Sequence, residues 1–321
     1  MQEGNNTSMD QKRLKTGVFF ALGAYTTWGA LPIFWRQLAE FGPLLIMAYR
    51  IFTLFILIVI AILALKGWSD LKTVFYDRHK FNWTLVSAVA ITVNWSAFIV
   101  AVTGDNVLQA SMANFLTPAF IILTGIIILK EDILPGQIAA LFMAITGLAV
   151  LLVGSGEFPY IALIMGSSLT MYGLSKRKAK LKTMTAMFWE TALTAPICLI
   201  YIIYAEYTGI PGLLTASGTF VIVLLLLSGL ATGLPILFYT LGNDRIPFVW
   251  MGVCQFISPT LMFLQAWLLY NEPLTAIRLA AFICIWISVA IFIWSIYRNS
   301  NIQPEQSPSA EHQDPSPDSR N

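Results

Sequence analysis

The chain has 321 residues, of which 57% are hydrophobic and 11% are charged, and its net charge is +2 with a mean hydropathy of +0.72. Soluble domains carry about 25% charged residues, so this composition excludes a mainly water-soluble fold and predicts an all-α integral membrane protein. Residues 1–16 are polar and lead directly into an apolar run. This pattern favours an uncleaved anchor over a secretory leader.

Apolar runs of roughly 17 to 25 residues, the length that a bilayer core requires, predict about ten transmembrane helices. In chain order the expected limits are 17–36, 44–65, 81–102, 107–129, 135–153, 158–174, 184–204, 219–241, 247–269 and 275–297. The separators between them are short and polar, so no soluble domain is expected within the membrane region. The last residues, 299–321, are rich in Pro, Ser and charge, which predicts a disordered tail.

The distribution of basic residues predicts the orientation. With the N-terminus in the cytoplasm, 16 of the 19 Lys and Arg residues fall in cytoplasmic segments. We therefore expect both termini to be cytoplasmic, with 1–16 and 299–321 as cytoplasmic segments. His79 and His312 lie in a predicted loop and in the tail. An intramembrane haem or zinc site built from paired histidines is therefore not expected, and neither is any other cofactor or metal.

A spaced motif recurs 141 positions along the chain. An amide, Phe, Pro and Glu occur first as Asn114, Phe115, Pro118 and Glu131, and again as Gln255, Phe256, Pro259 and Glu272. At an offset of 140, the run ending in Tyr49-Arg50 aligns with the run ending in Trp189-Glu190. Five spans followed by five matching spans predict an inverted repeat, since an odd number reverses the direction of entry. The expected repeats cover 17–153 and 158–297.

These features resemble the EamA-type drug/metabolite transporter superfamily, and at branch level the RarD group of chloramphenicol-sensitivity proteins. The resemblance covers about residues 15 to 297 and is carried by five segments: residues 255–264, 271–273, 49–50, 94–95 and 25–29. It implies a carrier in the bacterial inner membrane that moves a small organic solute by alternating access. It supplies no substrate, direction of transport or coupling ion.

Two ionisable side chains lie within predicted spans, Arg50 and Glu190, at equivalent places in the two repeats. Such residues usually face the interior of a bundle. One hypothesis is a mutual ion pair, although their backbones would differ by roughly 12 Å in height across the core. The second is one charge in each vestibule. A structural alternative has Arg50 reaching outward and Glu190 facing the basic segment 176–182. Glu190 is also a candidate carrier of a coupling proton.

Pro118 and Pro259 would each remove a helix hydrogen bond and bend a span. Asn114 and Gln255 precede them by one turn, so the sequence predicts paired gates beside a central site. Glu131 and Glu272 follow the two spans, and we expect them to cap these gates or the next helices, which begin near Pro135 and Pro273.

Deep aromatic residues beside polar or repeat-matched positions complete the expected solute pathway. The candidates are Trp28, Tyr49, Trp95, Trp189 and Tyr239, with Asn94 next to one of them. A cavity lined by such rings and few charges suits an aromatic or amphipathic solute. Glycines at 23, 29, 125, 147, 166, 229 and 252 would permit close approach of helices.

The sequence supports two other functional classes less well, an intramembrane enzyme and a channel. An intramembrane enzyme acting on a lipid would need clustered acids for Mg²⁺, and Glu131-Asp132 is the only adjacent acidic pair. A channel would need a symmetric ring of ligands. The expected partners are therefore a small organic solute, the lipid bilayer and a candidate proton, without nucleic acid. The sequence leaves a homo-oligomer open.

Overall fold

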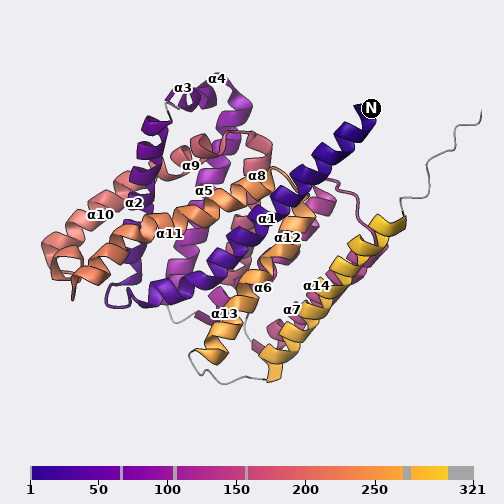
Figure 1. The fold of residues 1–321 in the computed structure, drawn as a ribbon. Coiled ribbons are helices and arrows are strands. Elements are labelled where there is room, and N and C mark those ends of the chain that lie inside the picture. The colour runs from indigo at the N-terminus through magenta and orange to yellow at the C-terminus, as the bar shows by residue number, and fades with distance from the viewer. Residues whose placement is uncertain (1, 66–67, 104–106, 156–157, 270–275, 303–321) are drawn as a thin grey trace, which may run out of the picture.

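The computed structural model describes residues 2–65, 68–103, 107–155, 158–269 and 276–302, which form helices joined by short turns (Figure 1). The elements are α1 Gln2–Arg36, α2 Pro43–Ala64, α3 Trp68–Leu71, α4 Thr73–Tyr76, α5 Arg78–Thr103, α6 Val107–Ile127, α7 Pro135–Ser155, α8 Tyr160–Ala179, α9 Thr183–Ala192, α10 Ala195–Thr208, the 3₁₀ turn η1 Leu213–Thr215, α11 Thr219–Asn243, α12 Phe248–Gln255, α13 Ile257–Leu268 and α14 Ala276–Ile302. No strand occurs in this described part. The chain is an all-α, multi-pass membrane protein, as expected.

Two predicted spans are each divided into two helices. The seventh, expected at 184–204, consists of α9 and α10 and continues to Thr208. Pro196 lies in the first turn of α10, where its missing N–H costs no hydrogen bond. The ninth consists of α12 and α13, with the break at Phe256. Hydropathy does not detect these breaks, because each lies within a longer segment whose average is apolar.

Three other boundaries differ from the sequence-based expectation. The first helix begins at Gln2, so most of segment 1–16 continues the first span as helix. The sixth span ends at Ala179 rather than 174, and three basic residues lie in its last turn. The tenth ends at Ile302, so the expected disordered tail begins four residues too early, and residues 303–321 lie outside the described chain.

Six described segments are long and apolar enough to cross a membrane: Gln11–Arg36, Pro43–Ala64, Ala195–Thr215, Thr219–Asn243, Phe248–Gln265 and Leu279–Ile296. Helix α8, whose main neighbour is α5, does not meet this standard. It buries Ser168, Thr170, Ser175 and Lys176. A helix covered by neighbours does not have to be uniformly apolar, because its polar groups can find partners within the bundle.

The packing pairs repeat when the chain halves are exchanged. Helix α5 of the first half packs on α8 of the second, and the equivalent helices α11 and α1 also pack on each other. In the same way, α6 packs on α8, and the equivalent helices α13 and α1 pack on each other. Three pairs join equivalent helices of the two halves: α2 with α10, α6 with α12, and α7 with α14. The pair α7 and α14 lies side by side at one edge of the bundle (Figure 1). This is the pattern expected of two similar five-helix halves related by a two-fold axis.

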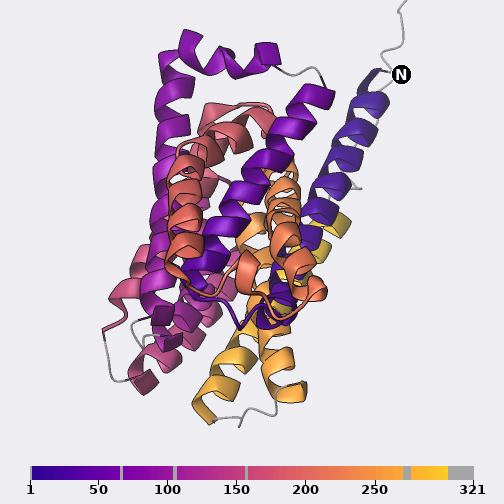
Figure 2. The ribbon, with the colours of Figure 1, turned by 90° about the vertical axis from the view of Figure 1, so that its left-hand side faces the viewer.

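One end of the bundle carries most of the basic residues and is called the basic face. It includes the N-terminal end of α1, the short helices α3 and α4, and the turn after α8 (Figures 1 and 2). Lys180 and Lys182 lie in that turn, and Lys182 pairs with Asp70 of α3 at 2.8 Å. The other end is called the opposite face.

The glycines expected at close helix approaches are confirmed. All seven have atoms of another helix within about 3 Å of where a Cβ would stand; Gly229 meets α2, and Gly252 meets α6. At Gly229 the neighbouring atoms include the backbone of Thr53 and Leu54, so side-chain rotation alone cannot make room.

We therefore expect Gly229→Val to separate α2 from α11 and to lower the free energy of unfolding by about 1–3 kcal/mol through overpacking. Thermal unfolding of the purified protein measures the effect. Gly42→Ala is the control, because a Cβ there meets nothing within 4 Å. Equal unfolding temperatures for the two variants would contradict the close approach.

Candidate functional site

A buried ion pair joins α8 to α9. Lys176 Nζ lies 3.2 Å from Glu190 Oε2, and their side chains are 2% and 5% exposed. Two opposite charges removed from water hold each other in their charged forms only where further hydrogen bonds complete their coordination. The surroundings of this pair supply those bonds.

Three hydroxyl groups complete the pair. Ser87 Oγ donates to Glu190 Oε1 at 2.7 Å, and Tyr172 OH donates to Oε2 at 3.0 Å. Lys176 Nζ donates to Thr240 Oγ1 at 2.8 Å and lies 4.8 Å from the centre of the Tyr172 ring. The network therefore ties together α5, α8, α9 and α11, close to the basic face.

The sequence identified Glu190 and, as one alternative, placed it toward segment 176–182, but it did not single out Lys176. Lys176 was placed in a basic loop because hydropathy falls at the first lysine after 174, whereas α8 continues for another turn and buries it. Tyr172 and Lys176 are four residues apart and share a helix face, which is the signal that could have indicated their joint role. Of the earlier alternatives, Glu190 faces segment 176–182, and the four ion pairs of the described residues include none between Arg50 and Glu190.

Arg50 lies in the half of the bundle nearer the opposite face. Its guanidinium carbon is 5.0 Å from the centre of the Trp35 ring and 5.7 Å from that of Trp95. The Nε atom is buried and has no hydrogen-bond partner. Arg50 therefore points into the space between α1, α2 and α5, with aromatic rings as its neighbours.

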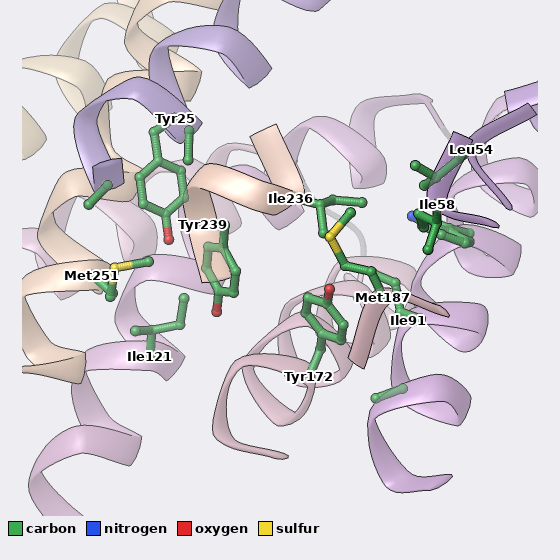
Figure 3. Packing of buried hydrophobic residues seen from close by; sticks show 14 of the residues in the cluster. Tyr25, Leu54, Ile58, Ile91, Ile121, Tyr172, Met187, Ile236, Tyr239 and Met251 are labelled. Atoms are coloured by element: carbon green, nitrogen blue, oxygen red, sulfur yellow. The ribbon is translucent and has the colours of Figure 1, made fainter. Parts of the chain in front are cut away.

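Four aromatic rings from three helices form a cluster in the middle of the bundle. Tyr239 lies 6.2 Å from Tyr25, 5.6 Å from Trp28 and 6.0 Å from Tyr172, measured between ring centres. Figure 3 shows Tyr25, Tyr239 and Tyr172 reaching toward the same region from α1, α11 and α8. The hydroxyls of Tyr25 and Tyr239 and the Oε1 atom of Gln255 are buried without a hydrogen-bond partner. Buried polar atoms usually have partners, so these orphans mark a place suited to a polar ligand.

The remaining predicted pathway residues take other positions. Tyr49 donates to Glu206 Oε1 at 2.8 Å, and Trp189 Nε1 donates to the Leu71 carbonyl at 3.2 Å, so Trp189 holds the short helices at the basic face. Asn94 Nδ2 donates to the Met165 carbonyl at 2.8 Å and joins α5 to α8. Asn114 contacts Met262 Sδ at 3.7 Å. These four side chains make contacts between elements rather than joining the aromatic cluster.

The two matched prolines act differently. Pro118 lies inside the continuous helix α6. Pro259 is the third residue of α13, just after the break at Phe256, so it occupies a first turn where no intrahelical hydrogen bond is lost. Of the two spans that carry the matched prolines, only the ninth is divided into two helices, so the prolines are not structurally equivalent, and paired gating stays a prediction.

Glu131 caps α12 instead of the next helix at Pro135. Its oxygens accept the backbone N–H groups of Phe248 at 2.6 Å and Val249 at 2.9 Å. Arg177 pairs with Glu131 at 2.7 Å and also donates to the Asn243 and Ile246 carbonyls. A carboxylate at a helix N-terminus satisfies free N–H groups and matches the helix dipole. Glu272 lies outside the described residues.

A cavity of about 760 Å³ opens on the basic face, next to this cap. Its lining includes Arg177, Asn243 and Asp244, whereas Lys176 and Thr240, close by on the same helices, are buried behind it. Burial raises the pKa of the Asp244 carboxyl, although neighbouring Lys176, Arg177 and Arg245 act to lower it. The buried network thus lies beside residues that line this vestibule and contacts the aromatic cluster through Tyr172.

The pair predicts strong coupling between its two members. Glu190→Gln leaves Lys176 buried and unpaired, and should cost about 3–5 kcal/mol of stability. The double variant Lys176→Met, Glu190→Gln should recover most of this loss. Thermal unfolding of all four species gives the coupling energy.

Lys182→Met is the matched control, because Lys182 pairs with Asp70 at the surface with its side chain 74% exposed. We expect a change of no more than about 1 kcal/mol there. Strictly additive losses in the double variant would refute a stabilising contact between Lys176 and Glu190.

The cap predicts a second stability effect. Glu131→Ala removes the acceptor of two backbone N–H groups and the partner of Arg177, and should cost about 1–3 kcal/mol. Asp132→Ala changes the adjacent, exposed acid and serves as the control. An unfolding temperature equal to that of the control would show that α12 does not depend on this cap.

Comparisons with known proteins agree with this architecture. The EamA-like transporter family matches residues 15–153. Protein RarD of Escherichia coli (strain K12) is 33% identical over 285 residues, covering 89% of this chain and 96% of that protein. The uncharacterized transporter YojE of Bacillus subtilis (strain 168) is 31% identical over 291 residues, with 89% and 96% covered.

A protein of known crystal structure shares the fold, with a TM-score of 0.69 and 18% identity, over 89% of this chain and 99% of that one. Alignment with relatives above 30% identity runs through both halves of the chain and therefore extends beyond the range of the family match. On this evidence the chain belongs to the EamA-like transporter family, in company with the proteins named RarD.

Proposed function

We propose that the protein is a secondary transporter that moves a small organic solute across the bacterial inner membrane by alternating access. The single observation that best supports this is the position of the buried network. It lies beside residues that line a vestibule on the basic face and contacts an interior that contains unpartnered polar atoms, and we propose that it closes the bundle there. A carrier closed toward one side requires such an arrangement.

The basic face is proposed to be cytoplasmic, with both termini on that side. The two five-helix repeats, 17–153 and 158–297, would enclose the solute between them. The exchange of packing pairs between the halves supports this division. When the carrier opens toward the basic face, the equivalent contacts of the other repeat would close the opposite face.

The aromatic cluster is the proposed solute site. Tyr25, Trp28 and Tyr239 present ring faces, and two of their hydroxyls have no partner. Rings with a few unpaired hydrogen-bonding groups suit a solute that has an apolar body and polar substituents. This matches the aromatic or amphipathic solute that the sequence suggested.

A proton is the proposed coupling ion, and Glu190 is its proposed carrier. Protonation of Glu190 would remove the negative partner of Lys176 and leave a buried cation without compensation. The network would then open more readily toward the vestibule, where water can solvate Lys176. Tyr172 and Ser87, which now donate to Glu190, are the groups that would reorient.

Reconstitution into liposomes tests the carrier proposal. We expect purified protein to catalyse saturable uptake and counterflow of a solute identified by metabolite profiling of a deletion strain. Product formation without flux would indicate an intramembrane enzyme instead. A conductance that does not saturate would indicate a channel.

Coupling is tested with the variant Lys176→Met, Glu190→Gln, which avoids an isolated buried charge. Uptake by the wild type should respond to an imposed pH gradient, and the response should be lost in the double variant. Lys182→Met is again the control. A gradient response that persists in the double variant would exclude the pair as the coupling site.

A further inference from the structure

We propose that Arg50 binds the carboxylate of the transported solute, with Trp35 and Trp95 flanking the planar part next to it. This inference rests on the proposed transport function and narrows its substrate to an organic anion. It follows from a difference between the two charges that the repeats place at equivalent positions. Glu190 has a charged partner, whereas the ion pairs of the described residues do not include Arg50.

The two interior charges, Arg50 and Glu190, differ in their charged partners. Glu190 has its own cation, Lys176, and three hydroxyl groups nearby. The four ion pairs formed by the described residues leave Arg50 out. Arg50 is partly buried, and its Nε is fully buried. A cation partly withdrawn from water is costly without a counter-charge, and ring faces compensate only part of that cost. The protein thus supplies a counter-charge at one of the two equivalent positions and leaves the other to a ligand.

The acid that contacts Tyr49, the neighbour of Arg50 in the sequence, already has its own hydrogen-bond donors. Glu206 accepts from the hydroxyl of Tyr49, the residue before Arg50, at 2.8 Å. It also accepts the backbone N–H groups of Leu213 at 2.6 Å and Leu214 at 3.1 Å. These bonds hold Glu206 on the turn after α10, so it serves Tyr49 and that turn rather than Arg50.

The geometry around Arg50 specifies the ligand chemistry. A guanidinium is a planar fork that matches the two oxygens of a carboxylate. Trp35 and Trp95 lie 5.0 and 5.7 Å from its carbon and restrict its orientation, while its Nε remains buried and unbonded. Indole rings beside the fork favour a planar, apolar group attached to the carboxylate.

The depth of Arg50 in the bundle favours a transported solute over a lipid headgroup as its ligand. Arg50 is seven residues from Pro43, where α2 begins, so it lies roughly 10 Å along the helix axis at 1.5 Å per residue. Trp95 belongs to the central buried cluster that also contains Tyr25 and Tyr239. The proposed anion site therefore adjoins the aromatic site rather than the lipid-facing surface.

Matched acids and amides test the inference. Thermal unfolding and tryptophan fluorescence would be titrated with phenylacetate, indole-3-acetate and benzoate, and with phenylacetamide, indole-3-acetamide and benzamide. We expect at least one acid to bind the wild type about tenfold more tightly than its amide. Arg50→Gln should abolish that preference, and Arg50→Lys, which keeps the charge but loses the fork, should retain part of it.

Arg298→Gln is the matched control, because Arg298 lies 5.4 Å from the Trp294 ring on the exposed side of α14. It should keep the preference of the wild type. The inference is overturned if amides bind as well as acids, if no acid binds in an Arg50-dependent way, or if Arg50→Gln retains the preference. It is also overturned if only micelles containing phosphatidylglycerol stabilise the protein through Arg50, which would identify a lipid headgroup site.

Counterflow separates this inference from the transport proposal. If the profiled solute exchanges through the wild type but is neutral or cationic, the anion site is wrong and the carrier stands. If no solute exchanges, the carrier proposal fails whatever the binding titrations show.

Discussion

The structure depends on one constraint, that a charge buried among apolar helices must have a counter-charge or an equivalent set of dipoles. Lys176 and Glu190 meet it for each other, and Ser87, Tyr172 and Thr240 complete their hydrogen bonds. Because these groups come from four helices, meeting the constraint also fixes those helices relative to one another. The polar network is therefore a contact among four helices that, in the proposed carrier, closes one side of the bundle.

Under the same constraint, the two halves of the duplicated architecture differ in how their interior charge is compensated. Arg50 and Glu190 occupy equivalent positions, yet only Glu190 has a charged partner among the described residues. A symmetric pair of halves would close and open the two sides at equal cost. In the proposed carrier, the asymmetric pairing would stabilise closure at the basic face and leave a cation available within the other half. That difference is what an alternating-access carrier needs in order to prefer one resting state.

The ends of buried helices are subject to a similar constraint, because their free N–H groups also need partners. Glu131 lies after α6 but caps α12 of the other half, and Arg177 of α8 completes the contact. The break at Phe256 makes α12 a separate helix of eight residues with its own N-terminus. The interrupted ninth span and its cap therefore belong together, since a short helix buried in a bundle has few other partners for its first N–H groups.

The sequence by itself determined the class and the approximate limits of the helices, because bilayer thickness acts on every segment locally. It also predicted the duplication, which the exchange of packing pairs supports. It also identified Arg50, Glu190 and Tyr239 as interior residues, since charge within an apolar run is costly wherever the helix points. Only the tertiary structure decided that Lys176 is buried and pairs with Glu190, that Glu131 reaches α12, and that Tyr49, Asn94 and Trp189 make contacts between elements. Those outcomes depend on how each helix is rotated and which helix lies beside it, and a one-dimensional hydropathy pattern carries neither quantity.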